Sequence, residues 1–162
     1  MSLRFLAVFL VLCTGALAQN SSTAPPPAAP ADDYSGTYSF LKDGEFVQIS
    51  VEDDNSVSGF ISRYGDTDSD RATFLDQFFK KGKLEGKKLT FTTQAVHGSW
   101  YDFTGTFARG QGKNPGDEAY YLLKGTLVQS KTDAEKKTSS KSSEVVFKSF
   151  PKDLDSNGPD QK

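Results

Sequence analysis

The residues best suited to chemistry gather in the stretch AVHGSWYDF, residues 95–103, which holds the single histidine and the single tryptophan of this 162-residue chain. His97 is the side chain that could act as a base near neutral pH, and a hydrolase would need it beside a nucleophile and an orienting acid. Ser99 and Asp102 follow it too closely along one hairpin to predict a triad, and no G-x-S-x-G motif occurs. We therefore expect no enzyme, with a hydrolase using His97 as the less favoured alternative.

The acidic residues predict no metal site. Asp66, Asp68 and Asp70 have the spacing of the first half of a calcium loop, but Arg71 stands where that loop requires glycine. Acids in this stretch also suit the N-terminus of a helix. Zinc sites need several histidine or cysteine ligands, and the chain offers one of each. We expect neither a metal nor a cofactor.

The first 18 residues have the pattern of a cleaved signal peptide. Arg4 supplies a positive charge, residues 5–12 are apolar, and Ala16 and Ala18 form an A-x-A cleavage signal. The apolar run is shorter than the roughly 20 residues that span a bilayer, so we expect no membrane span. The single cysteine, Cys13, lies in this segment, and an exported chain without disulfides favours a bacterial periplasmic or extracellular protein.

Composition divides the remainder into three parts. Residues 19–33 are rich in proline and small polar residues and predict a disordered linker, residues 34–151 predict a single β domain, and residues 152–162 predict a disordered tail. Without Arg4 the 19 basic residues become 18 against 21 acidic ones, a net charge near −3. This charge argues against nucleic acid as a partner, because phosphate binding needs a concentrated positive surface.

Alternation of apolar and polar residues predicts about eight β-strands. A break follows the third of them, where Phe74, Leu75, Phe78 and Phe79 have helical spacing and predict a short helix near 69–78 before the next strand. The glycine-rich residues 110–118 and the lysine-rich residues 131–143 predict loops. The predicted strands are 35–41, 45–52, 57–64, 77–86, 88–96, 100–109, 119–130 and 144–150.

Eight antiparallel strands with one apolar face predict an all-β, up-and-down barrel, with a two-sheet β-sandwich as the alternative. The opening triplet Gly36-Thr37-Tyr38, followed by this meander, resembles the calycin barrels, the lipocalins and avidins, which commonly begin with a Gly-x-Trp strand. Tyr38 stands where tryptophan is usual, and Lys148 is the nearest candidate for the basic residue that lipocalins place late in the barrel. The resemblance implies the barrel fold, and no ligand contact is carried over from either family.

Successive turns of an up-and-down barrel alternate between its two ends, which puts the loop after the third strand and the HGS turn, residues 97–99, at the same end. The candidate ligand-binding residues there are Arg63, Tyr64, His97, Trp100 and Tyr101. We expect an exported, non-catalytic binding domain for a small apolar molecule inside the barrel, or for a glycan or protein at its mouth. The alternative is a structural protein of the cell envelope with a filled barrel.

Overall fold

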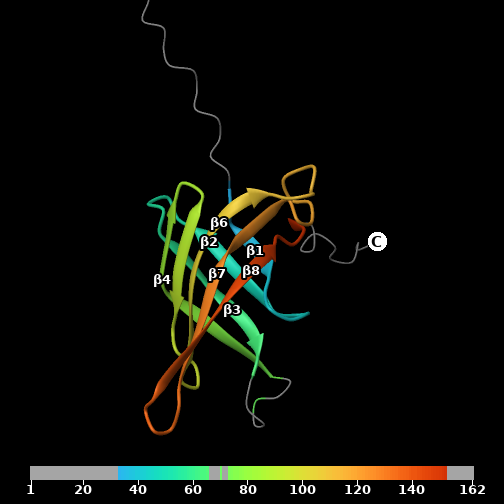
Figure 1. The fold of residues 1–162 in the computed structure, drawn as a ribbon. Coiled ribbons are helices and arrows are strands. Elements are labelled where there is room, and N and C mark those ends of the chain that lie inside the picture. The colour runs from blue at the N-terminus through green and yellow to red at the C-terminus, as the bar shows by residue number, and fades with distance from the viewer. Residues whose placement is uncertain (1–32, 66–69, 71–72, 153–162) are drawn as a thin grey trace, which may run out of the picture. The chain divides into compact units, whose positions relative to one another are not determined.

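The computed structural model describes residues 33–65, 70 and 73–152, and these residues form eight β-strands. Each strand pairs antiparallel with the next one along the chain, so that the order in the sheet is the order in the sequence (Figure 1). The strands are β1 (Gly36–Ser39), β2 (Phe46–Val51), β3 (Val57–Tyr64), β4 (Phe74–Glu85), β5 (Lys88–Thr93), β6 (Ser99–Arg109), β7 (Tyr121–Thr132) and β8 (Thr138–Lys148).

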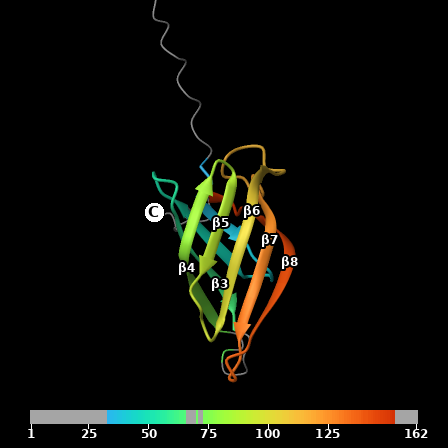
Figure 2. The same ribbon diagram turned by 60° about the vertical axis from the view of Figure 1, so that its left-hand side comes forward.

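The curled sheet brings its first strand against the chain that follows its last. Tyr38 of β1 forms an antiparallel bridge with Ser149, and the amide of Phe150 donates to the carbonyl oxygen of Thr37 at 2.8 Å. Figure 2 shows β4 to β8 side by side along one wall. The single sheet confirms the predicted up-and-down barrel and excludes the alternative of two stacked sheets.

The interior of the barrel is packed with aromatic side chains, because every second residue of a strand points inward. Six rings form a continuous chain, with successive ring centroids 4.3 to 5.6 Å apart. Rings at these separations are in contact. In order, they belong to Phe79, Phe91, Phe103, Phe147, Phe40 and Tyr101.

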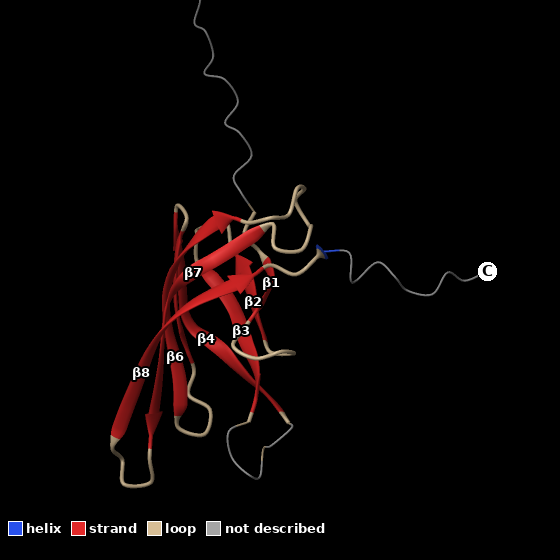
Figure 3. Cartoon of the chain, turned by 45° about the vertical axis from the view of Figure 1, so that its right-hand side comes forward, coloured by secondary structure: helices blue, strands red, loops and turns tan. Residues whose placement is uncertain are grey.

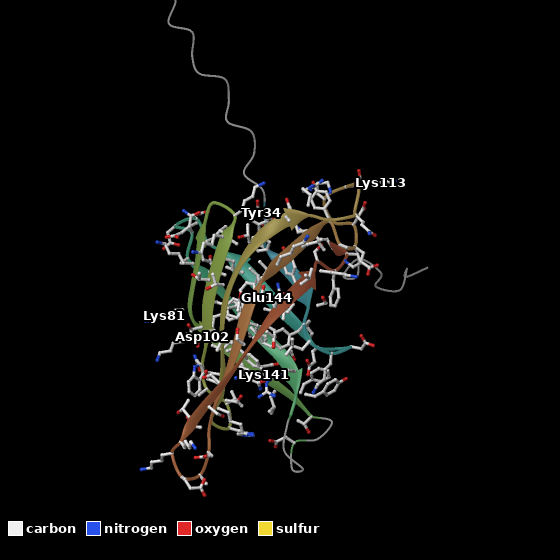
Figure 4. The ribbon with its side chains drawn as sticks, in the orientation of Figure 1. Tyr34, Lys81, Asp102, Lys113, Lys141 and Glu144 are labelled. Atoms are coloured by element: carbon white, nitrogen blue, oxygen red, sulfur yellow. The ribbon has the colours of Figure 1, made fainter. Side chains whose placement is uncertain are left out.

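Tyrosines close the end of the barrel where the described chain begins, near the Tyr34 label in Figure 4. The Tyr34 ring stacks on Phe107 with centroids 4.2 Å apart and meets Tyr121 edge-on at 4.9 Å. The Tyr38 hydroxyl donates to the Tyr34 carbonyl oxygen at 2.8 Å. Burial raises the pKa of Tyr38, so its hydroxyl stays protonated and keeps this hydrogen bond.

The predicted helix near 69–78 is wrong for the residues from Phe74 onward, which belong to β4. Residues 69, 71 and 72 of that prediction lie outside the described residues. Gln77 is fully buried on the inner face, whereas Phe74 and Phe78 are 46% and 54% exposed on the outer face. Because aromatic side chains occupy both faces of this strand, the sequence spacing imitates the period of a helix.

The hairpin of β7 and β8 is longer than the sequence predicts, because the expected loop over 131–143 narrows to the residues between Thr132 and Thr138. The hydroxyls of Thr132 and Thr138 lie 2.9 Å apart across the hairpin, as do those of Ser130 and Ser140. Polar pairs stabilise strands without giving the apolar alternation that marks a half-buried strand. The hairpin extends at the lower end of the barrel in Figures 1 and 3.

Asp117 orders the loop between β6 and β7. The backbone amides of Asn114 and Lys113 each donate to Asp117 Oδ2 at 2.8 Å. These hydrogen bonds favour the ionised carboxylate and lower the pKa of Asp117, the amide of Asn114 having the largest effect. The glycine-rich loop is therefore held by a side chain that titrates.

We expect Asp117→Asn to lower the melting temperature at neutral pH, with a deficit that shrinks in acid. A carboxylate accepts stronger hydrogen bonds from amides than a neutral side chain does. Since the folded-state pKa of Asp117 lies below its unfolded value, this stabilisation is present above the unfolded pKa and is lost as the pH falls through the folded one. Melting curves between pH 7 and pH 2 test this, with exposed Glu118→Gln as control. A deficit independent of pH would contradict the prediction.

Candidate functional site

A two-residue turn joins β5 to β6. His97 and Gly98 have positive φ angles of 49° and 73°, and the flanking residues Val96 and Ser99 exchange two backbone hydrogen bonds of 2.9 and 3.0 Å. Positive φ at both central positions defines a type I′ turn, whose twist matches that of the adjoining strands. The turn that the sequence predicts over 97–99 is therefore centred on His97 and Gly98, and Ser99 becomes the first residue of β6.

Ser99 opens β6 on its inner face, two residues before Tyr101. The residue is 2% exposed, and its Oγ is the buried side-chain polar atom that has no hydrogen-bond partner among the described residues. Leaving a buried hydroxyl without a partner costs about 1–3 kcal/mol. A ligand that supplies a hydrogen bond here would recover that free energy. Ser99 also pairs directly with Lys131 of β7, which places both side chains on one face of the sheet.

A buried polar network centred on Gln77 lies beside Ser99. Arg63 Nε donates to Gln77 Oε1 at 2.5 Å, and Arg63 Nη1 donates to the Tyr64 carbonyl oxygen at 3.0 Å. Gln77 Nε2 donates to the carbonyl oxygens of Ser99 at 2.8 Å and Gln94 at 3.2 Å. The network therefore ties the ends of β3, β4 and β6 together and fixes the backbone of Ser99.

An imidazole–carboxylate contact stands beside this network. His97 Nδ1 lies 2.8 Å from Asp70 Oδ2, and the His97 side chain is 55% exposed. The contact links the β5–β6 turn to the connection between β3 and β4. Asp66 and Asp68, the other acids of the calcium-like spacing, lie outside the described residues. Within the part of the chain that the structure describes, no group of three or more histidine, cysteine or acidic residues is placed to hold a metal ion.

A small pocket at one end of the barrel, which we call the Ser99 pocket, is lined in part by Arg63, Asp70, His97 and Ser99. Leu75 and Val96 give it apolar walls, and Lys131 adds a cation. Its free space is about 10 Å³, close to what one water molecule needs. Residues from the β3–β4 connection and from the β5–β6 turn meet in this pocket, as the alternation of turns in an up-and-down barrel predicts.

Of the five candidate residues, the structure brings Arg63 and His97 together in the Ser99 pocket. Tyr101 is buried in the barrel, with the Arg63 guanidinium carbon 5.7 Å from its ring centroid. Tyr64 and Trp100 lie on the outer face, where the Tyr64 ring is 4.5 Å from that of Phe74 and Trp100 is half-buried. The five residues therefore lie on both faces of the sheet, because adjacent residues of a strand point to opposite faces.

The sequence alone does not identify Ser99 and Lys131 as lining residues of one pocket, nor Gln77 as the centre of the network beside it. For Ser99 a signal exists, because it shares the alternate positions of the buried residues Tyr101 and Phe103. A hydroxyl at the end of an apolar row indicates a buried polar atom that needs a partner. Gln77 has no such signal unless β4 is first recognised as a strand.

The pocket contains an acid, a histidine and a serine, the residue types of a hydrolytic triad, but the serine is not hydrogen-bonded to the histidine. Asp70 faces His97 Nδ1 at 2.8 Å, as an orienting acid does in such triads, and Ser99 lines the same pocket. However, Ser99 Oγ makes no hydrogen bond to His97 or to any other described residue. The nucleophile–base contact of a triad is therefore not formed in this arrangement.

Aromatic rings also follow one another across the outer face of β2, β3 and β4. Phe46, Phe60 and Phe78 have successive ring centroids 5.9 and 5.5 Å apart, and we call these three residues the outer stripe. Phe78 is 54% exposed. Exposed apolar patches on soluble domains often mark surfaces of interaction.

The eight strands form an antiparallel up-and-down β-barrel, and comparison with solved structures finds chains of similar fold. The barrel is similar to rhizavidin, with a TM-score of 0.56 and 13% identity over 78% of this chain and 88% of that one. A rhizavidin–biotin complex gives 0.51 and 14% over 72% and 92%, and apo short afifavidin gives 0.51 and 16% over 72% and 95%. At these identities the likeness is one of fold, and it confirms the barrel expected from Gly36 to Tyr38 and the meander.

No family model and no curated protein matches the chain. The described residues contain no helix with the length and apolar character needed to cross a membrane.

Proposed function

We propose that this chain is a non-catalytic binding domain that takes a small molecule at the Ser99 pocket. The observation that carries the proposal is the Ser99 hydroxyl, which is 2% exposed, has no hydrogen-bond partner among the described residues and lines a pocket beside a buried guanidinium. Buried polar atoms of folded proteins are nearly always paired, and unpaired ones call for a functional explanation. The network around Gln77 holds the pocket in place before a ligand arrives, which favours binding.

The packed interior favours a site at the mouth over one inside the barrel. An apolar ligand in the barrel would have to displace rings such as Phe103 and Phe147, whose centroids are 5.6 Å apart. Removing a core ring costs about 3–5 kcal/mol. Biotin, the small molecule of the similar rhizavidin–biotin complex, is a useful probe for this chain. It would have to lie across the mouth and insert a polar end beside Ser99.

The proposal includes export of the domain. The leader pattern of residues 1–18 and the absence of cysteine beyond Cys13 support a bacterial periplasmic or extracellular location. Residues 19–33 would then act as a linker ahead of the domain formed by residues 34–151, with residues 152–162 as a tail.

A second candidate function is a structural protein of the cell envelope that binds a protein or glycan through its outer surface. The outer stripe favours it, because Phe78 is 54% exposed and stands in a row with Phe60 and Phe46. The filled interior is compatible with such a role, since no internal ligand is then needed.

Native mass spectrometry of the exported protein, purified without denaturation, tests the proposal. We expect a small-molecule adduct on the wild-type chain that is lost on unfolding and lost in Ser99→Ala. Ser130→Ala is the matched control, because Ser130 is also buried but bonds Ser140 at 2.9 Å outside the pocket. A second sample with added biotin shows whether biotin itself gives the adduct.

The possible outcomes separate the candidates. An adduct that persists in Ser99→Ala would place the ligand elsewhere, and wild-type protein that stays free of adduct, even with biotin, would overturn the proposal. Dimers or larger assemblies without an adduct would favour the second candidate. Turnover of a detected ligand, abolished in His97→Asn, would show an enzyme. Asparagine suits this control because it tolerates the positive φ that the type I′ turn requires.

A further inference from the structure

We infer that the outer face of β2, β3 and β4 is the interface of a homodimer, in which the outer stripe of one copy packs against the outer stripe of a second copy. The inference goes beyond the proposed function, because it concerns the outer wall of the barrel and not the Ser99 pocket. It commits the outer stripe to one partner, a second copy of this chain. Its starting point is the concentration of exposed aromatic side chains on these three strands.

Two further rings extend the outer stripe along the same face. In the β3–β4 ladder Tyr64 pairs with Phe74, four residues along each strand from the pair of Phe60 and Phe78. Positions four apart in a strand share a face, so all four rings lie on the outer face. Phe78 is 54% exposed and Phe74 is 46% exposed, and the Tyr64 ring lies 4.5 Å from that of Phe74. Monomeric soluble proteins rarely expose large apolar patches, so this one indicates a surface of interaction.

The rest of the barrel wall has a different outer face. On β5 and β6 the outward positions carry Thr90, Thr104 and Thr106, and Lys124 pairs with Thr106 from β7. A polar face of this kind is at home in water and needs no partner. The outer stripe is limited to β2, β3 and β4, which defines where a partner would bind.

Two opposite charges flank Phe78 on β4. Asp76 precedes Phe78 by two residues and Lys80 follows it by two, and all three side chains are exposed. At a rise of about 3.3 Å per residue the two charges stand about 13 Å apart along the strand, too far to pair with each other. Neither forms an ion pair within residues 33–65, 70 and 73–152. Lys81, labelled in Figure 4, is exposed beside Lys80 at a bulge of the strand.

A two-fold axis brings these charges together across the interface. Homodimers are most commonly related by such an axis, and each contact is then made twice. When the axis lies in the plane of the interface and crosses β4 at right angles beside Phe78, the two β4 strands face each other in opposite directions. Phe78 then meets its own counterpart, and Asp76 faces Lys80 of the partner subunit on either side of it. Sheets pack face to face about 10 Å apart, so the two side chains together can span the gap.

The same charges decide between arrangements and between partners. Two β4 strands running in the same direction would set each carboxylate against its own counterpart, which is repulsive. An anionic lipid surface would repel Asp76, which stands between the exposed rings of Phe74 and Phe78. A second copy offers both an aromatic surface and the opposite charge at the matching position.

Sedimentation velocity of the exported protein over a series of concentrations measures the dimer. We expect a monomer–dimer equilibrium in the wild type that Phe78→Ser weakens at least about a hundredfold, because symmetry removes two rings at once. Val146→Ser is the matched control, since Val146 is 50% exposed on β8, outside the proposed interface, and its replacement should leave the equilibrium unchanged. Unchanged far-UV circular dichroism would show that each variant is folded.

Charge reversal tests the register of the two copies. Asp76→Lys should weaken the dimer about tenfold or more, because both of its ion pairs become repulsions. The double variant Asp76→Lys with Lys80→Asp again places opposite charges across the axis and should recover most of the loss. A role of Asp76 within its own barrel would not be rescued in this way.

The outcomes distinguish failure of this inference from failure of the proposed function. A wild type that stays monomeric up to millimolar protein would overturn the homodimer, even if it binds anionic lipid vesicles, and so would a dimer that persists in Phe78→Ser. A double variant no better than Asp76→Lys would overturn the pairing of Asp76 with Lys80. The Ser99-dependent adduct is read by mass and the homodimer by sedimentation, so each proposal stands or falls on its own measurement.

Discussion

Gly125→Ala should destabilise the barrel by about 3 kcal/mol, at the upper end of the cost of overfilling a core. Gly125 of β7 pairs with Gly105 of β6. An added Cβ at Gly125 would lie 2.2 Å from the Thr104 carbonyl oxygen and 2.4 Å from Gly105 Cα. Both are backbone atoms, so no change of rotamer can relieve the clash and the two strands must separate. Thermal unfolding should show a melting temperature roughly 10 °C lower.

The matched control is Gly86→Ala in the turn between β4 and β5. Gly86 has a φ of 60°, and a Cβ there would meet no atom within 4 Å. Its replacement therefore measures the cost of left-handed backbone alone, about 1–2 kcal/mol. Equal melting temperatures for the two variants would show that the β6–β7 ladder yields easily, against the prediction for Gly125.

The pairing of these two glycines gives a structural reason for the Gly-Thr dipeptides that begin at residues 105 and 125 of the sequence. A Cβ at Gly105 would lie 2.3 Å from Phe103 Cζ, so Gly105 leaves room for the Phe103 ring, one of the six interior rings in contact. The sequence shows glycine at alternate positions among buried aromatics, which indicates close packing in a strand. Which ring occupies the space depends on the register of β6 and β7, and that register is set by contacts far apart in the sequence.

Alternation allows most of the barrel to be predicted, because one face of nearly every strand is apolar. It fails at β4, where Phe74 and Phe78 face outward while Leu75 and Phe79 face inward. It fails again at the tip of β7 and β8, where both faces are polar and exposed. In both segments the two faces are alike, so the period of two residues leaves no trace in the sequence.

The sequence predicts at which end of the barrel the candidate site lies, but it does not predict all of the residues that form it. Parity of the turns correctly brings the β3–β4 and β5–β6 connections to one end, and with them Arg63 and His97. Parity says nothing about which face a residue occupies near the end of a strand, and there Tyr64 and Trp100 turn outward. The membership of Lys131 follows from its pairing with Ser99, which needs the β6–β7 register.

Gln77→Leu should destabilise the protein by about 3 kcal/mol or more, because the substitution removes one partner from a buried network that includes a charge. Gln77 is fully buried, accepts from Arg63 Nε and donates to the carbonyl oxygens of Ser99 and Gln94. Leucine has a similar volume, so the core stays filled while three polar groups lose this partner. Chemical denaturation of both proteins measures the difference in the free energy of unfolding.

Gln48→Leu is the control for Gln77→Leu, because it measures the cost in stability of losing one amide side chain outside the buried network. Gln48 is half-buried on the outer face of β2 and accepts a single hydrogen bond, from Thr37 Oγ1 at 2.5 Å. Its replacement should cost about 1 kcal/mol or less. If Gln77→Leu costs no more than Gln48→Leu, the carbonyl oxygens of Ser99 and Gln94 and the guanidinium of Arg63 do not depend on Gln77. If it costs much more, Gln77 is the residue that holds Ser99 at the wall of the pocket, and binding at Ser99 should weaken in the same variant.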